Sequence, residues 1–341
     1  MSVSNRSATT LATSATHLLA PPPGWQPICY AVLADGTLAV LAADVDLAGE
    51  HLRITAAFQA SVSADPPSRL IELCITGTAR IWMAASAGWT EGPAFPLETP
   101  FPKFDRFSDG RWLVAASRSG GEADARVLAP DGVVLDRLTL GDGIEHVAID
   151  AEDRVWVGWF DEGMFGNDGW RVPGQEWPPS SNGVACFAAD GTLLPLPVWP
   201  AEAGTIADCY ALNVMGPGVW ACPYTEFPLV RFIPGETARW WRTHNVAPKA
   251  IAVDGNHALL AGGYNKEASR LVLVELVGNG LGEKAPLLAT WTLPLRRLPP
   301  SDNEWAPVWH RPSLLTGRGD TLHLVDDGCW YRWRVRDLVS S

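Results

Sequence analysis

Short apolar runs separated by turn residues recur along most of the chain. In residues 29–41, the runs Cys29–Leu33 and Leu38–Leu41 flank the turn pair Asp35-Gly36. Gly and Asp adopt positive φ at little cost, so such a pair favours a tight reversal of the chain. Apolar runs of this length, bounded by turn residues, are typical of strands. The pattern therefore predicts a β-hairpin.

The same strand–turn–strand unit recurs, and seven copies can be aligned. After residues 29–41 the copies lie at 70–85, 104–116, 144–159, 208–223, 249–262 and 311–325. Equivalent positions in the second strand run from Leu38 to Leu322, with a mean spacing of about 47 residues. Four-stranded propeller blades repeat every ~40–50 residues. We therefore expect an all-β chain that forms a single β-propeller over 1–341, with seven blades, or six because the copy at 70–85 is degenerate.

The two ends of the chain are expected to meet in one blade. The last copy is followed by only one clear strand, at 329–335, although a ring needs a complete final blade. Within the N-terminal segment 1–26, residues 8–19 are able to form a strand and have no clear partner of their own. We predict that they supply the outer strand of the last blade, the alternative being a disordered N-terminus. Irregular inserts are expected near 164–183 and 278–305.

Composition narrows the classes of protein further. Only 19% of the residues are charged and 47% are hydrophobic, which excludes a disordered chain. A formal net charge of −12 argues against nucleic-acid and anionic-membrane partners, since both require a basic surface. No apolar run approaches a membrane span, and the N-terminus lacks the apolar core of a secretory signal, so a cytoplasmic protein is expected. The six cysteines show no zinc-ligand spacing and are expected to be buried hydrophobic residues.

The 17 tryptophans fall into two groups along the repeats. One group is expected in the second strands of four successive copies, where a large side chain can fill the space between twisted sheets: Trp82, Trp112, Trp156 and Trp220. The other group lies in the two inserts or near the last copy, and comprises Trp170, Trp177, Trp305 and Trp309. This second group is expected either to form a contact surface or to pack as a cap over one blade.

Candidate site residues follow from the geometry of propellers, whose ligands usually meet the channel mouth where the inner strands begin. Residues at the starts of inner strands and in loops after second strands reach that face. The first set contains Glu145, His146, Asp208, Lys249 and His310. The second set contains Asp161, Glu162, Asn167, Tyr224 and Tyr264, and Trp170 extends it into the insert. Structural roles remain open for several of them. These are solvated turns for Asp161 and Glu162, packing for Tyr224 and Tyr264, interblade hydrogen bonds for Glu145 and His146, and a structural role for His310.

One copy resembles a known repeat. The stretch 150–159, Asp150-Ala-Glu-Asp-Arg-Val-Trp-Val-Gly-Trp159, resembles the propeller repeat of two-component-regulator sensor proteins, with an Asp, a short turn and a Trp-Val-Gly strand. The likeness implies a propeller fold. A looser similarity to gluconolactonase-type propellers implies one divalent cation, Ca²⁺ or Mg²⁺, at the channel. Under that similarity Glu145, Asp161, Asn167 and Asp208 would be ligands, with His146 or His310 as general base.

Two functions are therefore open. The sequence contains no nucleophile elbow, Walker loop or dinucleotide fingerprint. We expect a non-catalytic propeller that requires no cofactor and binds a small molecule, protein or peptide at the channel mouth and the Trp-rich inserts. The alternative is a metal-dependent hydrolase or lyase that acts on a small lactone or ester there, using Glu145, His146 or His310 as catalytic groups.

Overall fold

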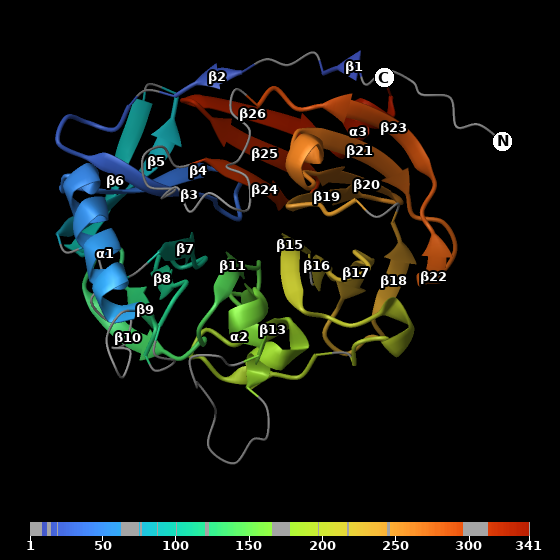
Figure 1. Cartoon of the computed structure of the whole chain (residues 1–341), viewed down its shortest axis with the longest axis horizontal. Coiled ribbons are helices and arrows are strands. Elements are labelled where there is room, and N and C mark those ends of the chain that lie inside the picture. Colours follow the sequence, from blue (N-terminus) through green and yellow to red (C-terminus); the bar gives the residue numbers. More distant parts are fainter. Residues whose placement is uncertain are drawn as a thin grey trace.

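The strands of the computed structural model form six sheets arranged around a central axis (Figure 1). It describes residues 9–11, 15–18, 20–62, 75, 77–86, 88–99, 101–119, 123–165, 178–196, 198–216, 218–243, 246–295 and 313–340. In each sheet the first strand of the repeat is innermost and the later strands of the same repeat follow outward in chain order. The described part of the chain is thus an all-β propeller, as predicted.

The first three blades each contain four antiparallel strands. Blade 1 consists of β3 (Gln26–Val32), β4 (Leu38–Ala43), β5 (Thr78–Ala85) and β6 (Gly88–Pro96). Blade 2 consists of β7 (Pro102–Arg106), β8 (Trp112–Ala116), β9 (Ala125–Leu128) and β10 (Val134–Leu138). Blade 3 consists of β11 (Ile144–Ile149), β12 (Val155–Trp159), β13 (Val184–Phe187) and β14 (Leu193–Leu194).

The other three blades recruit strands from outside their own repeat. Blade 4 consists of β15 (Asp208–Met215), β16 (Gly218–Tyr224), β17 (Leu229–Phe232) and β18 (Arg239–Arg242), extended by β22 (Leu281–Lys284). Blade 5 consists of β19 (Ala250–Asp254), β20 (His257–Ala261), β21 (Arg270–Glu275) and β23 (Leu287–Thr292), extended by β1 (Thr9–Thr10). Blade 6 consists of β24 (Leu314–Arg318), β25 (Thr321–Asp326), β26 (Cys329–Arg334) and β2 (Thr16–His17).

Helices and 3₁₀ turns lie between several of these strands, and one helix follows the last strand. They are α1 (Leu47–Val62), α2 (Asp161–Phe165), α3 (Val335–Val339), and the 3₁₀ turns η2 (Pro179–Asn182), η3 (Ala201–Ala203) and η4 (Asn265–Glu267). None of the helices in the described part of the chain has both the length and the apolar character needed to cross a bilayer.

The blade number is six, the alternative stated above, and the expected seven is wrong. The copies at 29–41 and 70–85 belong to one blade, because α1 separates β4 from the strand that pairs with it, β5. Ile81 pairs with Leu41, and Trp82 pairs with Val40. Both residues therefore lie in β5, the third strand of blade 1, and the second-strand position expected for Trp82 is wrong. Because this helix is inserted within blade 1, the sequence pattern shows two repeats where the structure has one blade.

The final blade is completed from the N-terminus, which confirms the predicted closure. Thr16 and His17 of β2 pair antiparallel with Trp330 and Cys329 of β26. The preceding strand β1 pairs in parallel with β23 of blade 5, so the N-terminal segment joins two blades. The region near 278–305 was expected to be an irregular insert, yet up to residue 295 it supplies β22 and the regular strand β23.

Apolar side chains fill the spaces between neighbouring blades. Trp112 packs in the cluster between blades 1 and 2, Trp156 in that between blades 3 and 4, and Trp220 in that between blades 4 and 5. All three lie in second strands, as predicted, and are at least 95% buried. Burial on this scale is the main favourable term in folding, and large rings fill the gap between twisted sheets efficiently.

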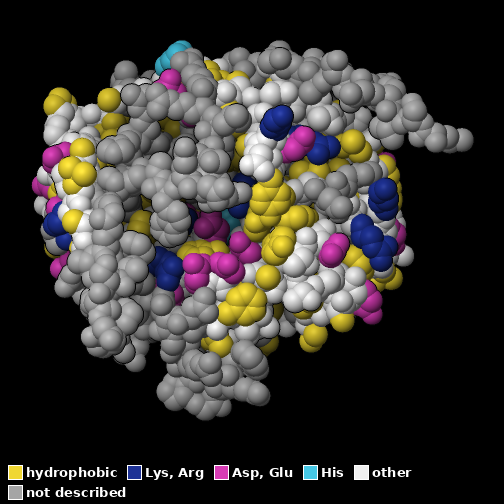
Figure 2. All heavy atoms as spheres, viewed as in Figure 1, with side chains coloured by type: hydrophobic (Ala, Val, Ile, Leu, Met, Phe, Trp, Pro, Cys, Tyr) yellow, Lys and Arg dark blue, Asp and Glu magenta, His cyan; other side chains and the backbone are white. Residues whose placement is uncertain are grey.

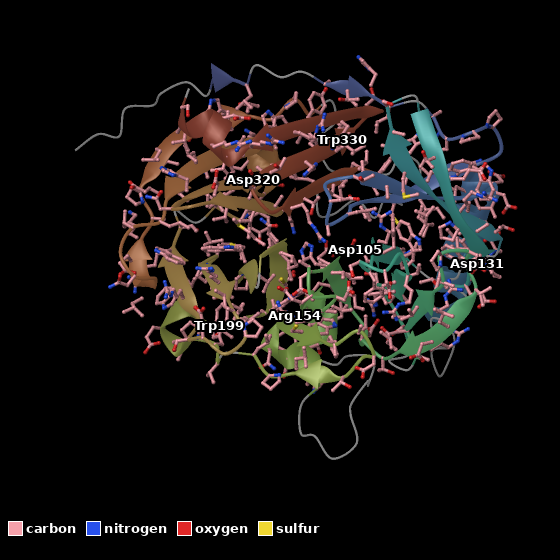
Figure 3. All side chains as sticks on the ribbon, turned by 180° about the vertical axis from the view of Figure 1, so that it is seen from behind. Asp105, Asp131, Arg154, Trp199, Asp320 and Trp330 are labelled. Atoms are coloured by element: carbon pink, nitrogen blue, oxygen red, sulfur yellow. The ribbon has the colours of Figure 1, made fainter. Side chains whose placement is uncertain are left out.

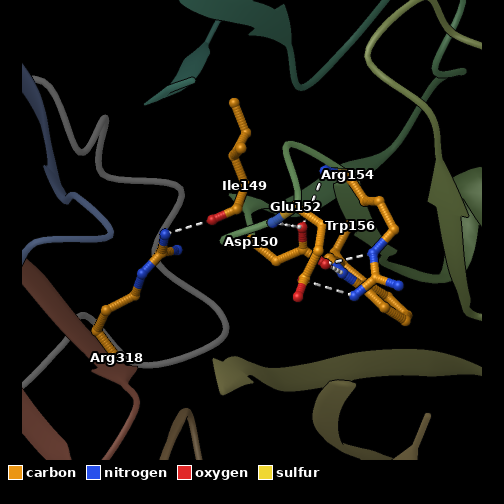
Figure 4. Close-up of polar contacts among 6 residues, drawn as sticks. All are labelled: Ile149, Asp150, Glu152, Arg154, Trp156 and Arg318. Carbon is orange, nitrogen blue, oxygen red and sulfur yellow. Dashed lines mark hydrogen bonds and ion pairs between the residues drawn. The ribbon is translucent and has the colours of Figure 1, made fainter. Parts of the chain in front are cut away.

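The turn of the regulator-like stretch is held by one carboxylate (Figure 4). Asp150 Oδ1 accepts the backbone N–H groups of Glu152 and Arg154 at 3.0 and 2.9 Å. Its Oδ2 accepts Arg154 Nε at 2.6 Å and Trp156 Nε1 at 2.9 Å. A single buried Asp thus fixes both the turn and the tryptophan that packs between blades, which explains why these residue types occur together.

Near the axis, the inner ends of several blades are joined by one ion pair. Arg318 at the end of β24 lies 3.1 Å from the Asp105 carboxylate and also donates to the carbonyl of Ile149. Asp105 accepts the Ile149 N–H at 2.7 Å. The next turn adds Gly319, which exchanges two hydrogen bonds of 2.8 Å with the Asn213 amide. The β24–β25 hairpin of blade 6 is therefore bonded to blades 2, 3 and 4.

Replacing Arg318 with Gln should lower the free energy of unfolding by about 3–5 kcal/mol at pH 8, since it leaves a buried carboxylate without its counter-ion. Burial raises the pKa of Asp105 even beside Arg318, and without that guanidinium the pKa should rise further. In the variant, the Asp105 carboxyl then loses its proton at a lower pH in the unfolded chain than in the folded chain. The loss in free energy of unfolding caused by Arg318→Gln should therefore be smaller at pH 5 than at pH 8. Denaturant unfolding at both pH values measures it.

Two further variants complete this test. Asp105→Asn in the Arg318→Gln background should recover much of the stability lost at pH 8, because the uncompensated charge is gone. Arg111→Gln removes an exposed guanidinium paired with Asp109 and should cost no more than about 1 kcal/mol. A deficit in Arg318→Gln that is the same at both pH values, and unchanged in the double variant, would contradict the explanation.

Candidate functional site

The candidate site lies at the end of the ring where inner strands begin and second strands end. Helix α2 follows β12 at this end, and η4 follows β20. Figure 2 shows acidic side chains near the centre of this face, with hydrophobic side chains gathered beside them around a hollow. The residues that form these two groups come from the adjacent blades 3, 4 and 5.

Four aromatic side chains, here called the aromatic wall, meet at the boundary of blades 4 and 5. Tyr210 of β15 is central: its ring lies 5.9 Å from Tyr224, 5.2 Å from Phe227 and 5.8 Å from Tyr264, between centroids. The hydroxyl groups of Tyr210 and Tyr264 are hydrogen-bonded to each other. Tyr224 and Tyr264 remain 40% exposed, so the wall presents ring surface and hydroxyl groups to solvent.

The loops behind the aromatic wall are held in an uncommon backbone conformation. Phe227 has φ 51° and Asn265, which follows Tyr264, has φ 48°. Non-glycine residues rarely adopt this left-handed region, and each instance costs on the order of 1 kcal/mol or more. Such strain persists where surrounding contacts fix the loop, so the ring positions of the aromatic wall are determined by the fold.

A lysine from blade 5 lies against the aromatic wall. The Nζ atom of Lys249 is 3.6 Å from the centroid of the Tyr210 ring, well inside the range of a cation–π interaction. Its backbone N–H is bonded to the Ala261 carbonyl at 2.8 Å, which fixes the residue at the start of the inner strand. The ammonium group is thus held between the aromatic wall and the nearby carboxylates.

Two of these carboxyl groups have pKa values displaced in opposite directions. Burial, aided by the negative charge of Glu145 and the acidic pair on α2, raises the pKa of Asp208 to about 7. Burial also acts to raise the pKa of Glu145. Electrostatic attraction to Lys103, and to a lesser extent to His146 and Lys249, outweighs that effect, so the pKa of Glu145 lies below its ordinary value. Near neutral pH, Glu145 is therefore ionised while Asp208 is partly protonated.

His146 is tied to the neighbouring blade. Its Nε2 lies 3.1 Å from the carbonyl oxygen of Cys209 in β15 and donates to it when that nitrogen carries the proton. Burial lowers the pKa of His146 to about 4, so the ring is neutral at pH 7. The interblade hydrogen bond expected as the structural role of this residue is present, although its partner is a backbone carbonyl.

The acidic pair Asp161 and Glu162 begins α2 at the edge of the same face. Glu162 lies 3.8 Å from Arg118 of blade 2, and hydrogen bonding to the adjacent Asp161 carboxyl raises the pKa of Glu162. The helix packs closely on the turn before β11, since a Cβ on Gly143 would come within 2.3 Å of the Gly163 nitrogen. The loop is therefore shaped by packing, and its two carboxyl groups stay partly exposed.

The structure brings most of the predicted site residues together. Glu145, His146, Asp208, Lys249, Tyr224 and Tyr264 surround one region, with Asp161 and Glu162 close enough to affect the pKa of Asp208. The predicted residues Asn167, Trp170 and His310 lie outside the described residues, as do Trp177, Trp305 and Trp309. Their roles stay predictions.

Three residues of this region were missed by the sequence analysis. Lys103 occupies the start of β7, so it could have been found by applying the inner-strand rule to every copy. Tyr210 follows Asp208 by two positions in β15, and strand alternation places both on one face. Phe227 is in an irregular loop, where no periodicity signals it.

The carboxyl groups do not form a metal-binding cluster in the part of the chain that the structure describes. There, no three His, Cys, Asp or Glu side chains are arranged to hold an ion. The structure describes three of the four proposed ligands, namely Glu145, Asp161 and Asp208. The fourth, Asn167, lies outside the described residues.

No family model matches the sequence, and no curated protein matches it. Among solved structures, virginiamycin B lyase from Staphylococcus aureus is similar at 10% identity over 94% of this chain and 98% of that chain, with a TM-score of 0.48. A gluconolactonase from Xanthomonas campestris is similar at 12% identity over 96% and 99%, with a TM-score of 0.43. An extracellular domain assigned to a hybrid two component system of B. thetaiotaomicron is similar at 13% identity over 94% and 39%, with a TM-score of 0.38.

The two kinds of propeller that the sequence resembles are thus both among the similar structures. At these identities and TM-scores the activities of those proteins belong to them. The chain is a six-bladed β-propeller by its own strand topology.

Replacing Asp208 with Asn should stabilise the protein at pH 8 by on the order of 1 kcal/mol, a discounted figure because the carboxyl is partly exposed. Its pKa of about 7 lies above the unfolded value near 4, so wild-type stability falls as pH rises from about 4 to 7. Asp208→Asn cannot titrate at this position and does not lose stability in this way. The difference in stability between the variant and the wild type should therefore nearly vanish at pH 4.5. Thermal unfolding at both pH values measures it.

Asp190→Asn provides the control with the opposite sign. This exposed turn carboxylate accepts the Thr192 N–H at 2.9 Å, and that hydrogen bond lowers the pKa of Asp190. Its removal should therefore destabilise the protein at pH 8 and have less effect at acid pH. Equal destabilisation of Asp208→Asn at both pH values would show that the carboxyl is not held in its neutral form by the fold.

Proposed function

We propose that this propeller binds a small polar organic molecule at the channel mouth formed by blades 3, 4 and 5. The observation that supports it best is the aromatic wall, with two half-exposed tyrosines from different blades that meet at Tyr210. Packing alone would bury these rings. Ligand sites in proteins combine such apolar surface with a few polar groups that converge on it, and both are present here.

The chemistry of the site suggests the kind of ligand. A ring-shaped molecule can lie with its apolar face on the aromatic wall, while Tyr224 and Tyr264 offer hydroxyl groups at its edge. Glu145 is an ionised acceptor and Lys249 a donor, with partly protonated Asp208 able to act as either. A hydroxylated ring with several donor and acceptor groups matches this set better than a purely apolar molecule does.

A binding screen tests the proposal. A panel of small hydroxylated and amino-substituted ring compounds is added to the protein, and each is scored by the rise in Tm and then by calorimetric titration. A true ligand present at 100 times its Kd should stabilise the protein by ~2.7 kcal/mol. Tyr210→Ala should weaken binding of that ligand about tenfold or more, because the ring that organises the aromatic wall is removed.

Tyr30→Phe serves as the matched control, since Tyr30 packs between blades 6 and 1, away from the aromatic wall. It should leave the affinity unchanged. The proposal is wrong if no compound of this class gives saturable binding, or if Tyr210→Ala binds the ligand as well as the wild type does. If no small molecule binds, but a protein or peptide binds in a way that requires Tyr224 and Tyr264, the face is a site for that kind of partner instead.

A second candidate, conversion of the bound molecule by a hydrolase or lyase reaction, is favoured by the opposite pKa displacements of Glu145 and Asp208. Two carboxyl groups whose environments separate their pKa values can divide the roles of base and acid. In this case the ionised Glu145 would accept a proton from water or substrate, and Asp208 would donate one to the leaving oxygen of an ester or lactone.

The pH dependence of turnover distinguishes this second candidate. With esters and lactones as substrates, with and without added Ca²⁺ or Mg²⁺, the rate should fall as pH rises through about 7, because Asp208 loses its proton there. Asp208→Asn should lower kcat by about 10²–10⁴-fold and abolish that limb of the profile. Glu145→Gln should lower the rate as well, and metal analysis of the wild type and this variant tests the ion. If wild type and both variants show no turnover, binding alone remains.

A further inference from the structure

A cavity of about 670 Å³ lies at the opposite end of the ring from the channel mouth. It is formed by blade 6 and by the β3–β4 turn of blade 1, which includes Asp35. Its lining also includes Arg318, Arg332, Arg334 and His323, with Asp320 and Asp337 beside them. Figure 3 views the ring from this end and labels Asp320 and Trp330 on blade 6. The volume is typical of cavities that hold small organic ligands.

The cavity exists because the side chains between blades 6 and 1 change from apolar to charged along β26. In β26, Cys329, Tyr331 and Trp333 are buried in the cluster shared with blade 5. The alternate positions face blade 1, and there Trp330 packs in an apolar cluster while Arg332 and Arg334 follow it. The part of the boundary between blades 6 and 1 that holds these arginines is therefore left open instead of being filled by apolar side chains.

The neighbouring strand places polar groups on the same face. His323 of β25 is the cross-strand partner of Arg332, and Thr321 is the partner of Arg334. Side chains of directly paired residues are neighbours on one face of a sheet. The arginines, the histidine and the threonine thus form one continuous polar surface on the wall of the cavity.

The cavity contains positive charge that the described part of the protein does not neutralise. Arg332 and Arg334 have no carboxylate within 4.0 Å among the described residues, and Arg332 is held over the Trp330 ring at 4.3 Å. Arg318, at the inner end of the cavity, is paired with Asp105, whose carboxylate also accepts the backbone N–H of Ile149. The guanidinium groups on the β26 side are therefore available to a ligand.

Two of the three acidic groups of the lining are paired with arginines outside the cavity. Asp35 is paired with Arg106 at 2.7 Å, and Asp337 lies 3.9 Å from Arg336. The Asp320 carboxylate accepts the hydroxyl of Thr321 at 2.7 Å. Asp35 and Asp337 thus have cationic partners outside the cavity, and Arg318 is paired with Asp105. The charges that remain in the lining are those of Arg332 and Arg334 against the single carboxylate of Asp320.

His323 adds a hydrogen-bond donor. Its ring is 3% exposed and stacks on Trp330, whose Nε1–H is directed at His323 Nδ1 at 3.3 Å. With Nδ1 acting as the acceptor, the proton of the neutral ring resides on Nε2. Burial, together with Arg332 and Arg318, lowers the pKa of His323 to about 3, so the ring stays neutral at physiological pH. The imidazole and the two guanidinium groups on β26 thus all offer N–H donors.

We propose that this cavity binds the phosphate group of a small organic molecule. Arginine forks form bidentate, charge-assisted hydrogen bonds with phosphate oxygens, and a phosphate dianion offers acceptors for Arg332, Arg334 and the His323 N–H together. The cavity is several times larger than the phosphate group itself, so the organic part of the ligand occupies the space toward the β3–β4 turn. The site is distinct from the channel mouth and does not depend on the function proposed there.

Isothermal titration in a phosphate-free buffer of low ionic strength tests the proposal, with glycerol 3-phosphate, inorganic phosphate and glycerol as probes. Glycerol 3-phosphate should bind with one-to-one stoichiometry, inorganic phosphate more weakly and glycerol not at all. Arg332→Gln and Arg334→Gln should each weaken binding about tenfold or more, and the double variant should abolish it. Arg332→Lys keeps the charge but loses the fork, so it should fall between wild type and Arg332→Gln.

Arg239→Gln is the matched control, because it removes one exposed arginine from β18 of blade 4. It should bind both phosphate compounds as the wild type does. Thermal unfolding of each variant verifies the fold, and Arg334, which is exposed and makes no stacking contact in the described structure, provides a variant that should fold normally. Failure of both phosphate compounds to bind saturably, unchanged affinity in the double variant, or an equal loss in Arg239→Gln would each overturn the proposal.

Discussion

The whole architecture depends on the fact that each blade is apolar on both faces. In β8 and β12 all five residues are buried, and in β16 every residue except Tyr224 is buried. A sheet with two apolar faces is stable only when a neighbour covers each of them, so the blades must form a closed ring. The polar contacts at the axis, centred on Asp105 and Arg318, then fix how the inner strands meet.

The repeat pattern was readable from the sequence because strand length and turn chemistry are local properties. Asp and Gly turns marked a strand pair in each of the six blades, and the equivalent second-strand positions were identified correctly in all six. The blade count failed at the one place where a non-local event intervened. Helix α1 lies between two strands that pair, and no local signal shows that Ile81 returns to Leu41.

The candidate site was partly predictable for the same reason. Strand starts and loop positions identified Asp208 and Lys249, since the fold brings those ends of the strands together. The central ring of the aromatic wall, Tyr210, escaped because it lies inside a strand and has the appearance of a core residue. The contacts that displace the pKa values join residues of different blades, so only the three-dimensional arrangement reveals them.

The two ends of the ring differ in electrostatic character, although the protein as a whole is acidic. The channel mouth gathers Glu145, Asp208 and the acids of α2 around the aromatic wall. The opposite end presents arginines that have no carboxylate partner in the described structure, in a protein with a net charge of −12. Local charge rather than net charge determines what a recessed site attracts. The two ends of the ring therefore differ in the charge that they present to solvent.

The pairing of β2 with β26 has a consequence for how the chain reaches this structure. His17 and Cys329 are neighbours across that strand pair, although 312 positions separate them in the sequence. Contacts between residues so distant in sequence form late, because a very long loop must close before they bring any gain. Until then β26 is an unpaired edge strand, able to bind a strand of another molecule. The protein should be most prone to aggregation after five blades have folded and before the sixth receives its N-terminal strand.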